Sequence, residues 1–357
     1  MSQKRSLRRC RVYAAASLVV ALVALCAWGL GAQPAREADG DSRAADSSPV
    51  LLGGAPPLAD AMAESQEVGP QNLLVTGNGV DTGSVTAVDV DGDAALGTAD
   101  STTYVYTPPG YDAGSSNRYA VVYLLHGTPG RSSDWFSGTS LAARLDHLID
   151  DGAIPPVIAV SPEISTPEVS DTRCMDSTTG GPLIDTYLTQ RVVPWVDETY
   201  RTYADADHRV LMGFSMGAFC ATNLLFHHQD MFSSAAGMAD YGEPGPDAAP
   251  LLADDSEYAG QSPIDYLADP DFEVREGLRF YLTVGGMSLD TDVDDTPLLA
   301  DLVAGRGADV VYEPDESADH DWQMVSDHVD RALGMLDDHE AGIGHVHAHF
   351  NHRGRHQ

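Results

Sequence analysis

The sequence predicts an α/β fold in which helices cover both faces of a mostly parallel central sheet. Three observations carry this prediction. Short apolar runs that end in Gly or Pro alternate with helical patterns along most of the chain. One of these runs ends in GFSMG, residues 213–217, and leads directly into a helical pattern. The chain has 357 residues with 43% hydrophobic content, which is enough for the core of one large domain with residues left for tails.

The first 71 residues are expected to precede the folded domain. Basic residues within the first eleven positions come before an uncharged stretch from Val12 to Pro34, which is the order of an export signal. We therefore expect residues 1–35 to act either as a cleaved export signal or as a signal anchor, because about 20 apolar residues span a bilayer. Residues 36–71 are rich in Ala, Asp, Ser, Gly and Pro, a composition typical of a disordered spacer.

The folded domain is expected over residues 72–338, and it begins with β-rich segments. Gly, Pro and Asp interrupt the runs LLVTG, GSVTAVDVDG and TTYVYTPPGY. The segment AVDVDGDAALG has alternating aspartates, but its Gly lies at the wrong place for a calcium loop. This segment therefore predicts a hairpin turn.

Strands and helices then alternate to the end of the domain. Strands are expected at residues 118–127, 155–163, 208–213, 278–286 and 308–316. Helical patterns occupy residues 139–152, 182–200, 216–228, 296–305 and 322–337. Pro194 is expected to kink the second of these helices. The alternation indicates a parallel sheet with its functional site at the carboxyl ends of the strands.

A serine between a strand and a helix is typical of a nucleophile elbow. In GFSMG the turn is so tight that the flanking positions must be Gly, and the Ser215 hydroxyl projects above the sheet. The alternative is a Gly–Ser turn without chemistry. Because the preceding strand and the following helix are the context that the motif requires, we interpret Ser215 as the nucleophile.

A serine nucleophile requires a base, which His320 is placed to supply. His320 follows the last predicted strand and precedes the final helix, where this topology delivers its histidine. His227, His228 and His328 lie on predicted helices and are interpreted as surface or packing residues.

The base in turn requires a carboxylate, expected after the strand at 278–286. Asp290 and Asp292 both qualify; we prefer Asp290 because it is closer to the end of the strand, and keep Asp292 as the alternative acid. The acidic run around them has Asp where a calcium loop needs Gly. We therefore expect no metal at the site and no cofactor.

The oxyanion of an acyl-transfer intermediate needs two backbone donors. One is expected from the N–H of Met216, directly after the nucleophile, at the start of the helix. The other is expected from Thr128, in the loop that follows the strand ending in YLLHG.

Four segments together resemble the putative esterase family of α/β-hydrolases: YVYTPPGYD, RYAVVYLLHGTPG with SSDWF, GFSMGAFCA, and DHDW. That family includes esterase D (S-formylglutathione hydrolase), feruloyl and enterochelin esterases, and secreted mycolyltransferases. The resemblance covers residues 75–338. It implies the α/β-hydrolase fold and a serine hydrolase or acyltransferase, with Ser215 as nucleophile, His320 as base, an Asp after the seventh strand, and Thr128 and Met216 as oxyanion donors. The segment GGMSLDTDV departs from the family, because it is longer than the common Gly-x-x-Asp.

Two cysteines remain once Cys10 and Cys26 are assigned to the export segment. Cys174 and Cys220 form an even pair in an oxidising compartment, which favours a disulfide that holds the loop VSDTRCMDSTTGG beside the elbow helix. The alternative is two unpaired thiols. Residues 339–357 form a His-rich tail, interpreted as disordered with incidental affinity for Zn, Ni or Cu rather than as part of the catalytic site.

The charge of the chain limits its partners. A formal net charge of -34, from 54 acidic and 20 basic residues, argues against binding to nucleic acid or anionic lipid. We expect an exported serine esterase that hydrolyses small-molecule or cell-envelope carboxylic esters through an acyl-enzyme on Ser215. One alternative is an acyltransferase, mycolyltransferase-like, that passes the acyl group to a sugar or cell-envelope hydroxyl. A second is a non-catalytic surface binding protein on a hydrolase fold.

Overall fold

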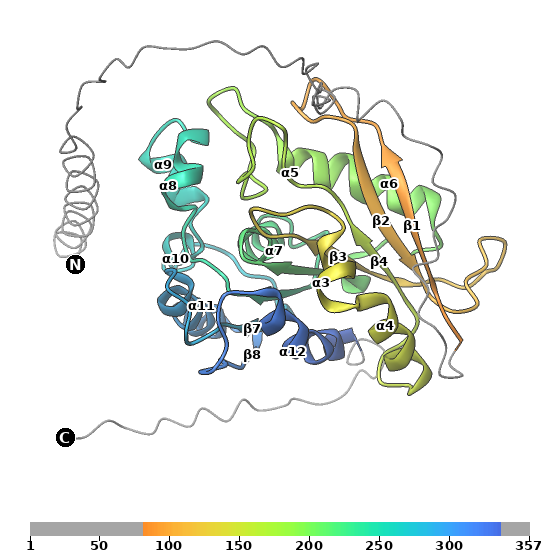
Figure 1. Cartoon of the computed structure of the whole chain (residues 1–357). Coiled ribbons are helices and arrows are strands. Elements are labelled where there is room, and N and C mark those ends of the chain that lie inside the picture. Colours follow the sequence, from red (N-terminus) through yellow and green to blue (C-terminus); the bar gives the residue numbers. More distant parts are fainter. Residues whose placement is uncertain (1–80, 337–357) are drawn as a thin grey trace, which may run out of the picture. The chain divides into compact units, whose positions relative to one another are not determined.

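The computed structural model describes residues 81–336 (Figure 1). The export segment expected at 1–35, the spacer at 36–71 and the His-rich tail at 339–357 lie outside this range. Within the described range, none of the helices has the length and apolar character needed to cross a membrane.

A sheet with strand order β1-β2-β4-β3-β5-β6-β7-β8 forms the centre of the domain. The β1 and β2 strands form an antiparallel hairpin, as expected from the first segments of the domain, and β2 also pairs antiparallel with β4. All other neighbours are parallel. The strands are β1 (Ser84–Val90), β2 (Ser101–Thr107), β3 (Ala120–Leu125), β4 (Val157–Ser161), β5 (Arg209–Phe214), β6 (Ser234–Met238), β7 (Arg279–Thr283) and β8 (Asp309–Tyr312).

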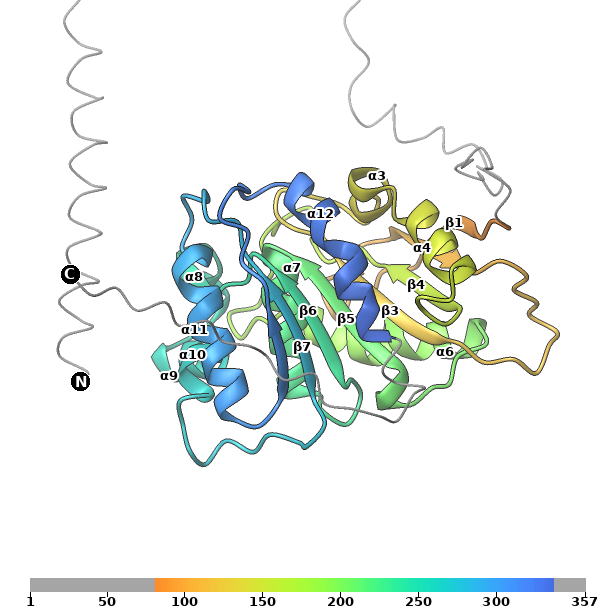
Figure 2. The ribbon, with the colours of Figure 1, turned by 90° about the horizontal axis from the view of Figure 1, so that it is seen from below.

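Helices cover both faces of this sheet, as predicted, and Figure 2 shows α12 in front of it and α6 behind. The helices are α3 (Asp134–Thr139), α4 (Leu141–Asp150), α5 (Ile184–Tyr187), α6 (Val193–Thr199), α7 (Met216–His227), α8 (Gly245–Ala248), α9 (Asp255–Gly260), α10 (Pro263–Tyr266), α11 (Asp292–Gly305) and α12 (Trp322–Leu333). Alternate residues of each strand point to opposite faces. On β3, therefore, Val121 and Tyr123 belong to the core cluster that includes residues of α7 and α11, whereas Val122 and Leu124 belong to the cluster that includes residues of α3, α4 and α12.

The structure departs from the predicted elements at β6, which the sequence analysis did not anticipate. Its sequence, SAAGM, consists of small residues without the β-branched and aromatic side chains that mark strands. The strand forms because it lies buried between β5 and β7, where small side chains leave room for helices on both faces. The segment between β6 and β7 adds the short helices α8, α9 and α10.

The helix predicted at 182–200 is interrupted rather than simply kinked. A π-helical segment, Leu188–Val192, separates α5 from α6 and lies directly before Pro194. Proline has no N–H for the helical ladder, and a wider turn before it accommodates the missing bond.

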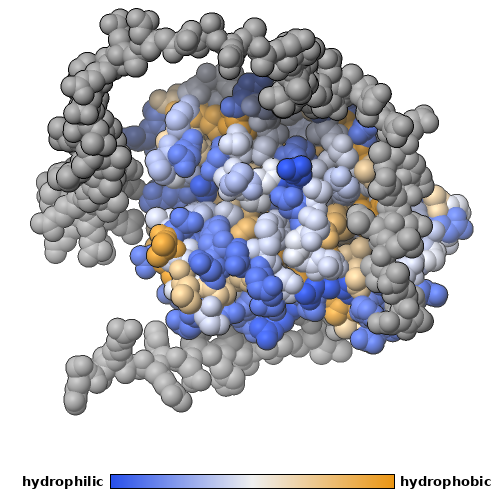
Figure 3. All heavy atoms as spheres, viewed as in Figure 1, coloured by the Kyte–Doolittle hydropathy of each residue, from blue (hydrophilic) through white to orange (hydrophobic). Residues whose placement is uncertain are grey.

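The surface of the domain is largely hydrophilic on the face shown in Figure 3. Among the exposed hydrophobic residues of the described chain, Met287 and Leu289 are the most exposed, at 61% and 101%, and both lie on the loop between β7 and α11. This loop also carries Asp290, so its apolar side chains lie close to the residues of the candidate site.

Candidate active site

Ser215 lies at the junction of β5 and α7 in a strained backbone conformation. Its φ of 56° is in a region that a residue with a side chain rarely adopts. A Cβ atom at Gly213 would lie 1.8 Å from the carbonyl oxygen of Gly217, and one at Gly217 would lie 2.0 Å from that of Leu125. Both flanking positions therefore require glycine, for the reason that the sequence motif implied.

The two backbone N–H groups that the sequence predicts as oxyanion donors lie close to Ser215. Met216 begins α7, so its N–H has no carbonyl one turn back to receive it. Thr128 follows Gly127, where an added Cβ would come within 3.2 Å of the Ser215 Cβ. Among residues 81–336, neither the Met216 nor the Thr128 N–H has a hydrogen-bond partner. Both predicted donors are therefore unpaired and close to Ser215.

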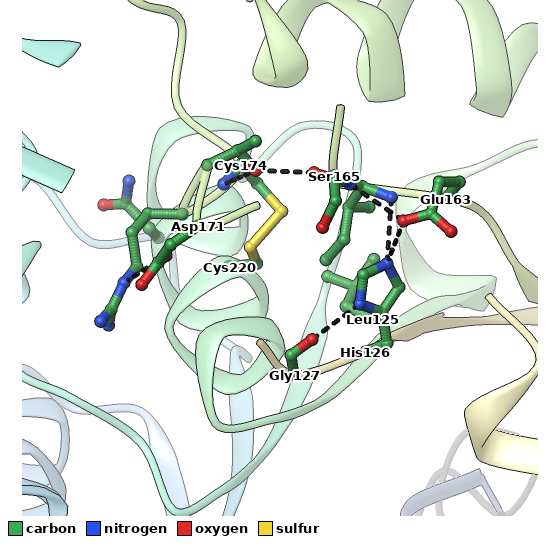
Figure 4. Close-up of a disulfide and its surroundings, with 12 residues drawn as sticks. Leu125, His126, Gly127, Glu163, Ser165, Asp171, Cys174 and Cys220 are labelled. Atoms are coloured by element: carbon green, nitrogen blue, oxygen red, sulfur yellow. Dashed lines mark hydrogen bonds and ion pairs between the residues drawn. A yellow bond between two sulfur atoms is a disulfide. The ribbon is translucent and has the colours of Figure 1, made fainter. Parts of the chain in front are cut away.

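His126 and Glu163 hold the loop that carries Thr128 (Figure 4). The buried His126 ring lies between Gly127 O, 2.8 Å from Nδ1, and Glu163 Oε1, 2.7 Å from Nε2. Burial raises the pKa of Glu163, but hydrogen bonds from His126 and from backbone N–H groups lower it by more, so the net pKa lies below its usual value. The pair ties the end of β3 to the end of β4.

Replacing Glu163 with glutamine is expected to lower the free energy of unfolding at pH 7 by about 1–3 kcal/mol, because the charged, half-buried partner of the buried His126 is lost. The pKa of Glu163 is lower in the folded state than in the unfolded state. Its contribution to the free energy of unfolding is therefore complete above the unfolded-state pKa of 4.5 and is lost as the pH falls through the folded-state pKa. Urea unfolding from pH 7 to pH 3 measures this. The exposed Glu276→Gln is the control, and an equal loss in both variants, or a pH-independent one, would contradict the assignment.

Asp292, and not Asp290, makes the hydrogen bond to His320. Asp292 Oδ2 lies 2.9 Å from His320 Nδ1, whereas the nearest oxygen of Asp290 lies 3.8 Å away. The Asp292 side chain is fully buried and that of Asp290 is 59% exposed. The preference for Asp290 is therefore wrong, and the alternative, Asp292, lies at the acid position.

The path of the chain after β7 explains this correction. The N–H groups of Gly286 and Met287 donate to the carbonyls of Asp315 and Ala318, so the loop follows the segment that leads to His320. Helix α11 then begins at Asp292, four residues earlier than predicted, and turns its carboxylate inward, where Ser288 Oγ donates to Oδ1 at 2.7 Å. Chain distance from the strand could not reveal this inward turn.

The DHDW segment places His320 through its neighbours. Asp321 caps α12 by accepting from the N–H groups of Gln323 and Met324. Trp322 packs edge-on against Trp135 and also contacts Phe214, the residue before the nucleophile. The His320 ring contacts Phe214 as well, with ring centroids 5.0 Å apart. His320 is thus held against the strand that leads to Ser215.

Tyr241 lies beside both Ser215 and His320. Its ring centroid is 6.3 Å from that of His320. Burial raises the pKa of Tyr241 to about 12, against the lowering effect of a hydrogen bond with the Ser215 hydroxyl. Among the described residues, no hydrogen bond joins Ser215 to His320. Such bonds often form only when substrate is present.

The predicted disulfide between Cys174 and Cys220 is present (Figure 4). It joins the loop after β4 to α7, one turn beyond Ser215. This loop is also bonded to the segment between β6 and β7, since the Thr178 N–H donates to Leu251 O at 2.9 Å and the Ala253 N–H donates to Thr178 Oγ1 at 3.0 Å. The two segments form a wall beside Ser215. Residues of this wall pack with Phe219 of α7 in a small apolar cluster that also contains Met175, Ala248, Leu251 and Leu252.

The other helical histidines form structural contacts. His228 pairs with Asp185 at 2.6 Å, and His227 contacts the carbonyl of Gly260. His328 is 5% exposed and its Nδ1 lies 2.8 Å from the Tyr281 hydroxyl, so it is a packing residue.

A family model described as putative esterase matches residues 95–323. The chain belongs to the putative esterase family. An esterase of Mycobacterium tuberculosis is 31% identical over 128 residues, which are 34% of this chain and 25% of that protein. An endo-1,4-beta-xylanase/feruloyl esterase of Xylanibacter ruminicola is 29% identical over 134 residues, which are 37% of this chain and 18% of that protein. The chain thus spans a quarter or less of the length of these two relatives.

Solved structures of esterases share the fold of this family member. A ferulic acid esterase superimposes with a TM-score of 0.62 over 72% of this chain and 99% of that chain, at 20% identity. The likeness concerns the fold, which is the α/β-hydrolase fold that the sequence predicted.

Sequence reasoning missed several residues of the site. Ser288 and Tyr241 lie in segments without a helical or strand periodicity. Glu163 is the last residue of the strand predicted at 155–163. One signal in the sequence is His126, which directly follows the apolar residues of the β3 strand in YLLHG. A histidine buried at this position needs a polar partner, which Glu163 supplies. Arg173 is buried in the loop before Cys174, although arginines are mostly exposed, and its sequence carries no signal of this burial.

Proposed function

We propose that this protein is an exported serine esterase that hydrolyses carboxylic esters through an acyl-enzyme on Ser215. The observation that carries the proposal is the arrangement of a strained Ser215 between two unpaired backbone N–H groups, with an Asp292–His320 pair packed against the same strand end. Each part matches a step that ester cleavage requires. Membership of the putative esterase family supports the same reaction class.

In the proposed reaction the Ser215 hydroxyl attacks the ester carbonyl while His320 Nε2 accepts its proton. Asp292 accepts the hydrogen bond of His320 Nδ1, which orients the ring and stabilises the imidazolium. The N–H groups of Met216 and Thr128 donate to the oxyanion. His320 then gives the proton to the departing alcohol, and water activated by His320 releases the acyl group.

The surroundings of the site favour an ester with an apolar part. Met287 and Leu289 are exposed on the loop that carries Asp290, and they offer an apolar surface close to the site. Export is supported by the basic-then-apolar order of residues 1–35 and by the disulfide, which persists in oxidising compartments.

A fluorophosphonate probe is expected to label the protein at Ser215, because an activated serine with oxyanion donors is phosphonylated rapidly. Peptide mass spectrometry of the labelled protein identifies the site. Labelling should disappear in Ser215→Ala and persist in Ser137→Ala, an exposed serine of α3. Label that survives in Ser215→Ala would overturn the proposal.

The same protein distinguishes an esterase from an acyltransferase. p-Nitrophenyl esters of graded chain length are hydrolysed with and without a sugar acceptor, and the acyl products are identified. Free acid as the main product in both conditions supports the esterase. Acyl sugar as the main product would instead assign the transferase reaction to the same serine.

A further inference from the structure

We propose that Arg173 forms an anion subsite beside Ser215, so that the preferred substrate is an ester that carries a carboxylate. This inference rests on the proposed esterase function and adds a substrate class to it. It arises from the unused hydrogen-bond donors of a buried arginine in the wall next to the nucleophile.

Arg173 is buried, with only 9% of its side chain exposed, and just one of its nitrogens has a protein acceptor. Nε donates to Asp171 Oδ1 at 2.9 Å. Nη1 is enclosed and has no hydrogen-bond partner, and among residues 81–336 Nη2 has none either. A buried polar donor without an acceptor is unfavourable, and buried arginines usually pair with a carboxylate through two nitrogens. Because Nη1 is enclosed by protein, Nη2 is the nitrogen of this group that remains for a ligand.

The position of Arg173 connects it with the reacting groups. Its guanidinium carbon lies 4.6 Å from the centre of the Tyr241 ring and 5.5 Å from that of Phe219. Tyr241 in turn lies beside His320, with ring centroids 6.3 Å apart, and is near enough to Ser215 for the serine hydroxyl to affect the pKa of Tyr241. Arg173 is thus separated from the nucleophile by about one aromatic ring. An ester held at Ser215 reaches it with a substituent of a few carbon atoms.

The backbone holds Arg173 in this position. Arg173 and Cys174 both have positive φ, at 48° and 50°, and Cys174 is joined to α7 by the disulfide (Figure 4). On the other side, a Cβ at Gly245 would lie 3.7 Å from Nη2. Because residue 245 is a glycine, no side chain from this position occupies the space beside Nη2.

The nearby carboxyl groups do not supply the missing acceptor. Asp171 is used by Nε alone. Asp240 is fully buried, and its Oδ2 accepts from Thr222 while its Oδ1 makes no hydrogen bond to Arg173. Burial raises the pKa of Asp240 to about 7, and the charge of Arg173 is among the effects that oppose this rise. Asp292 is bonded to His320 and Ser288, and Asp290 is exposed to solvent that screens its charge. Arg173 is therefore the residue of this wall that selects an anionic group.

The test compares matched anionic and neutral esters in two arms. In the acyl arm, the mono-p-nitrophenyl ester of glutaric acid is compared with p-nitrophenyl hexanoate. In the alcohol arm, 4-carboxyphenyl acetate is compared with 4-methylphenyl acetate. The measured quantity is the ratio of kcat/KM for the anionic ester to that for the neutral one, so that any general damage to the enzyme cancels.

In Arg173→Met this ratio is expected to fall by about 10- to 100-fold in one arm, which identifies the side of the ester that carries the anion. Arg173→Lys should retain part of the ratio, because it keeps the positive charge but not the shape of the guanidinium. The control is Arg191→Met, which removes an exposed arginine that pairs with Asp93. A ratio unchanged by Arg173→Met in both arms would overturn the subsite.

A binding measurement separates the subsite from the proposed reaction. Glutarate and benzoate are titrated against Ser215→Ala and against Ser215→Ala with Arg173→Met, with binding followed by ligand-observed NMR. Binding of either anion that is lost with Arg173 supports the subsite even if no ester is hydrolysed. Binding of neither, or equal binding to both variants, refutes it. Loss of all ester hydrolysis in the native chain would count against the esterase function alone.

Discussion

Replacing His320 with alanine is expected to lower kcat/KM for ester hydrolysis by about 10⁵- to 10⁶-fold, while the fold survives. Without a base, the Ser215 hydroxyl keeps its proton, and because the members of a triad act as a unit, loss of the base costs nearly as much as loss of the nucleophile. Steady-state hydrolysis of a p-nitrophenyl ester measures the effect, and circular dichroism checks the fold.

The control for His320→Ala is His328→Asn. His328 is buried and lies 2.8 Å from the Tyr281 hydroxyl, and asparagine can keep a polar atom near the position of Nδ1. This variant is expected to lose some stability but to keep its activity. Comparable losses of activity in the two variants would mean that the base is another residue.

Replacing Asp292 with asparagine is expected to lower kcat by about 10³- to 10⁴-fold. An amide at this position donates where the carboxylate accepts, so it favours the wrong tautomer of His320 and no longer stabilises the imidazolium. The variant keeps the size of the side chain, and its ability to accept from Ser288 keeps the loop in place. Steady-state kinetics with saturating ester measures the loss.

Asp290→Asn is the matched control, since it changes the same functional group two residues away. Asp290 lies 3.8 Å from His320 Nδ1 with 59% of its side chain exposed, so solvent replaces most of its interaction with the ring. Its loss should be less than about tenfold. A larger loss in Asp290→Asn than in Asp292→Asn would reverse the assignment made from the structure.

The elbow could be predicted from the sequence because its requirements are local. The two glycines of GFSMG are needed within five residues of chain, and the strand and helix on either side have their own apolar patterns. The atoms that would collide with a Cβ at Gly213 belong to Gly217, in the same short turn. For the same reason Met216 could be named as an oxyanion donor.

The carboxylate could not be settled in this way. Asp290 and Asp292 differ by two residues in a loop, and the sequence has no period there that indicates direction. The choice depends on hydrogen bonds between residues 286–287 and residues 315–318 and on the residue at which α11 begins. These contacts join segments about 30 residues apart, so they exist only in the folded chain.

By itself, the sequence predicted the α/β class, the chain order of Ser215 and His320, a disulfide between Cys174 and Cys220 as the favoured pairing, and the family. These features follow from local patterns, or from two cysteines that have no other partner in the domain. Only the tertiary structure decided that β6 is a strand, that Asp292 contacts His320, and that Arg173 lies buried against Tyr241 with unused donors. Each of these depends on burial between elements that are distant in the chain, and the side chains involved have no local preference for the conformation they adopt.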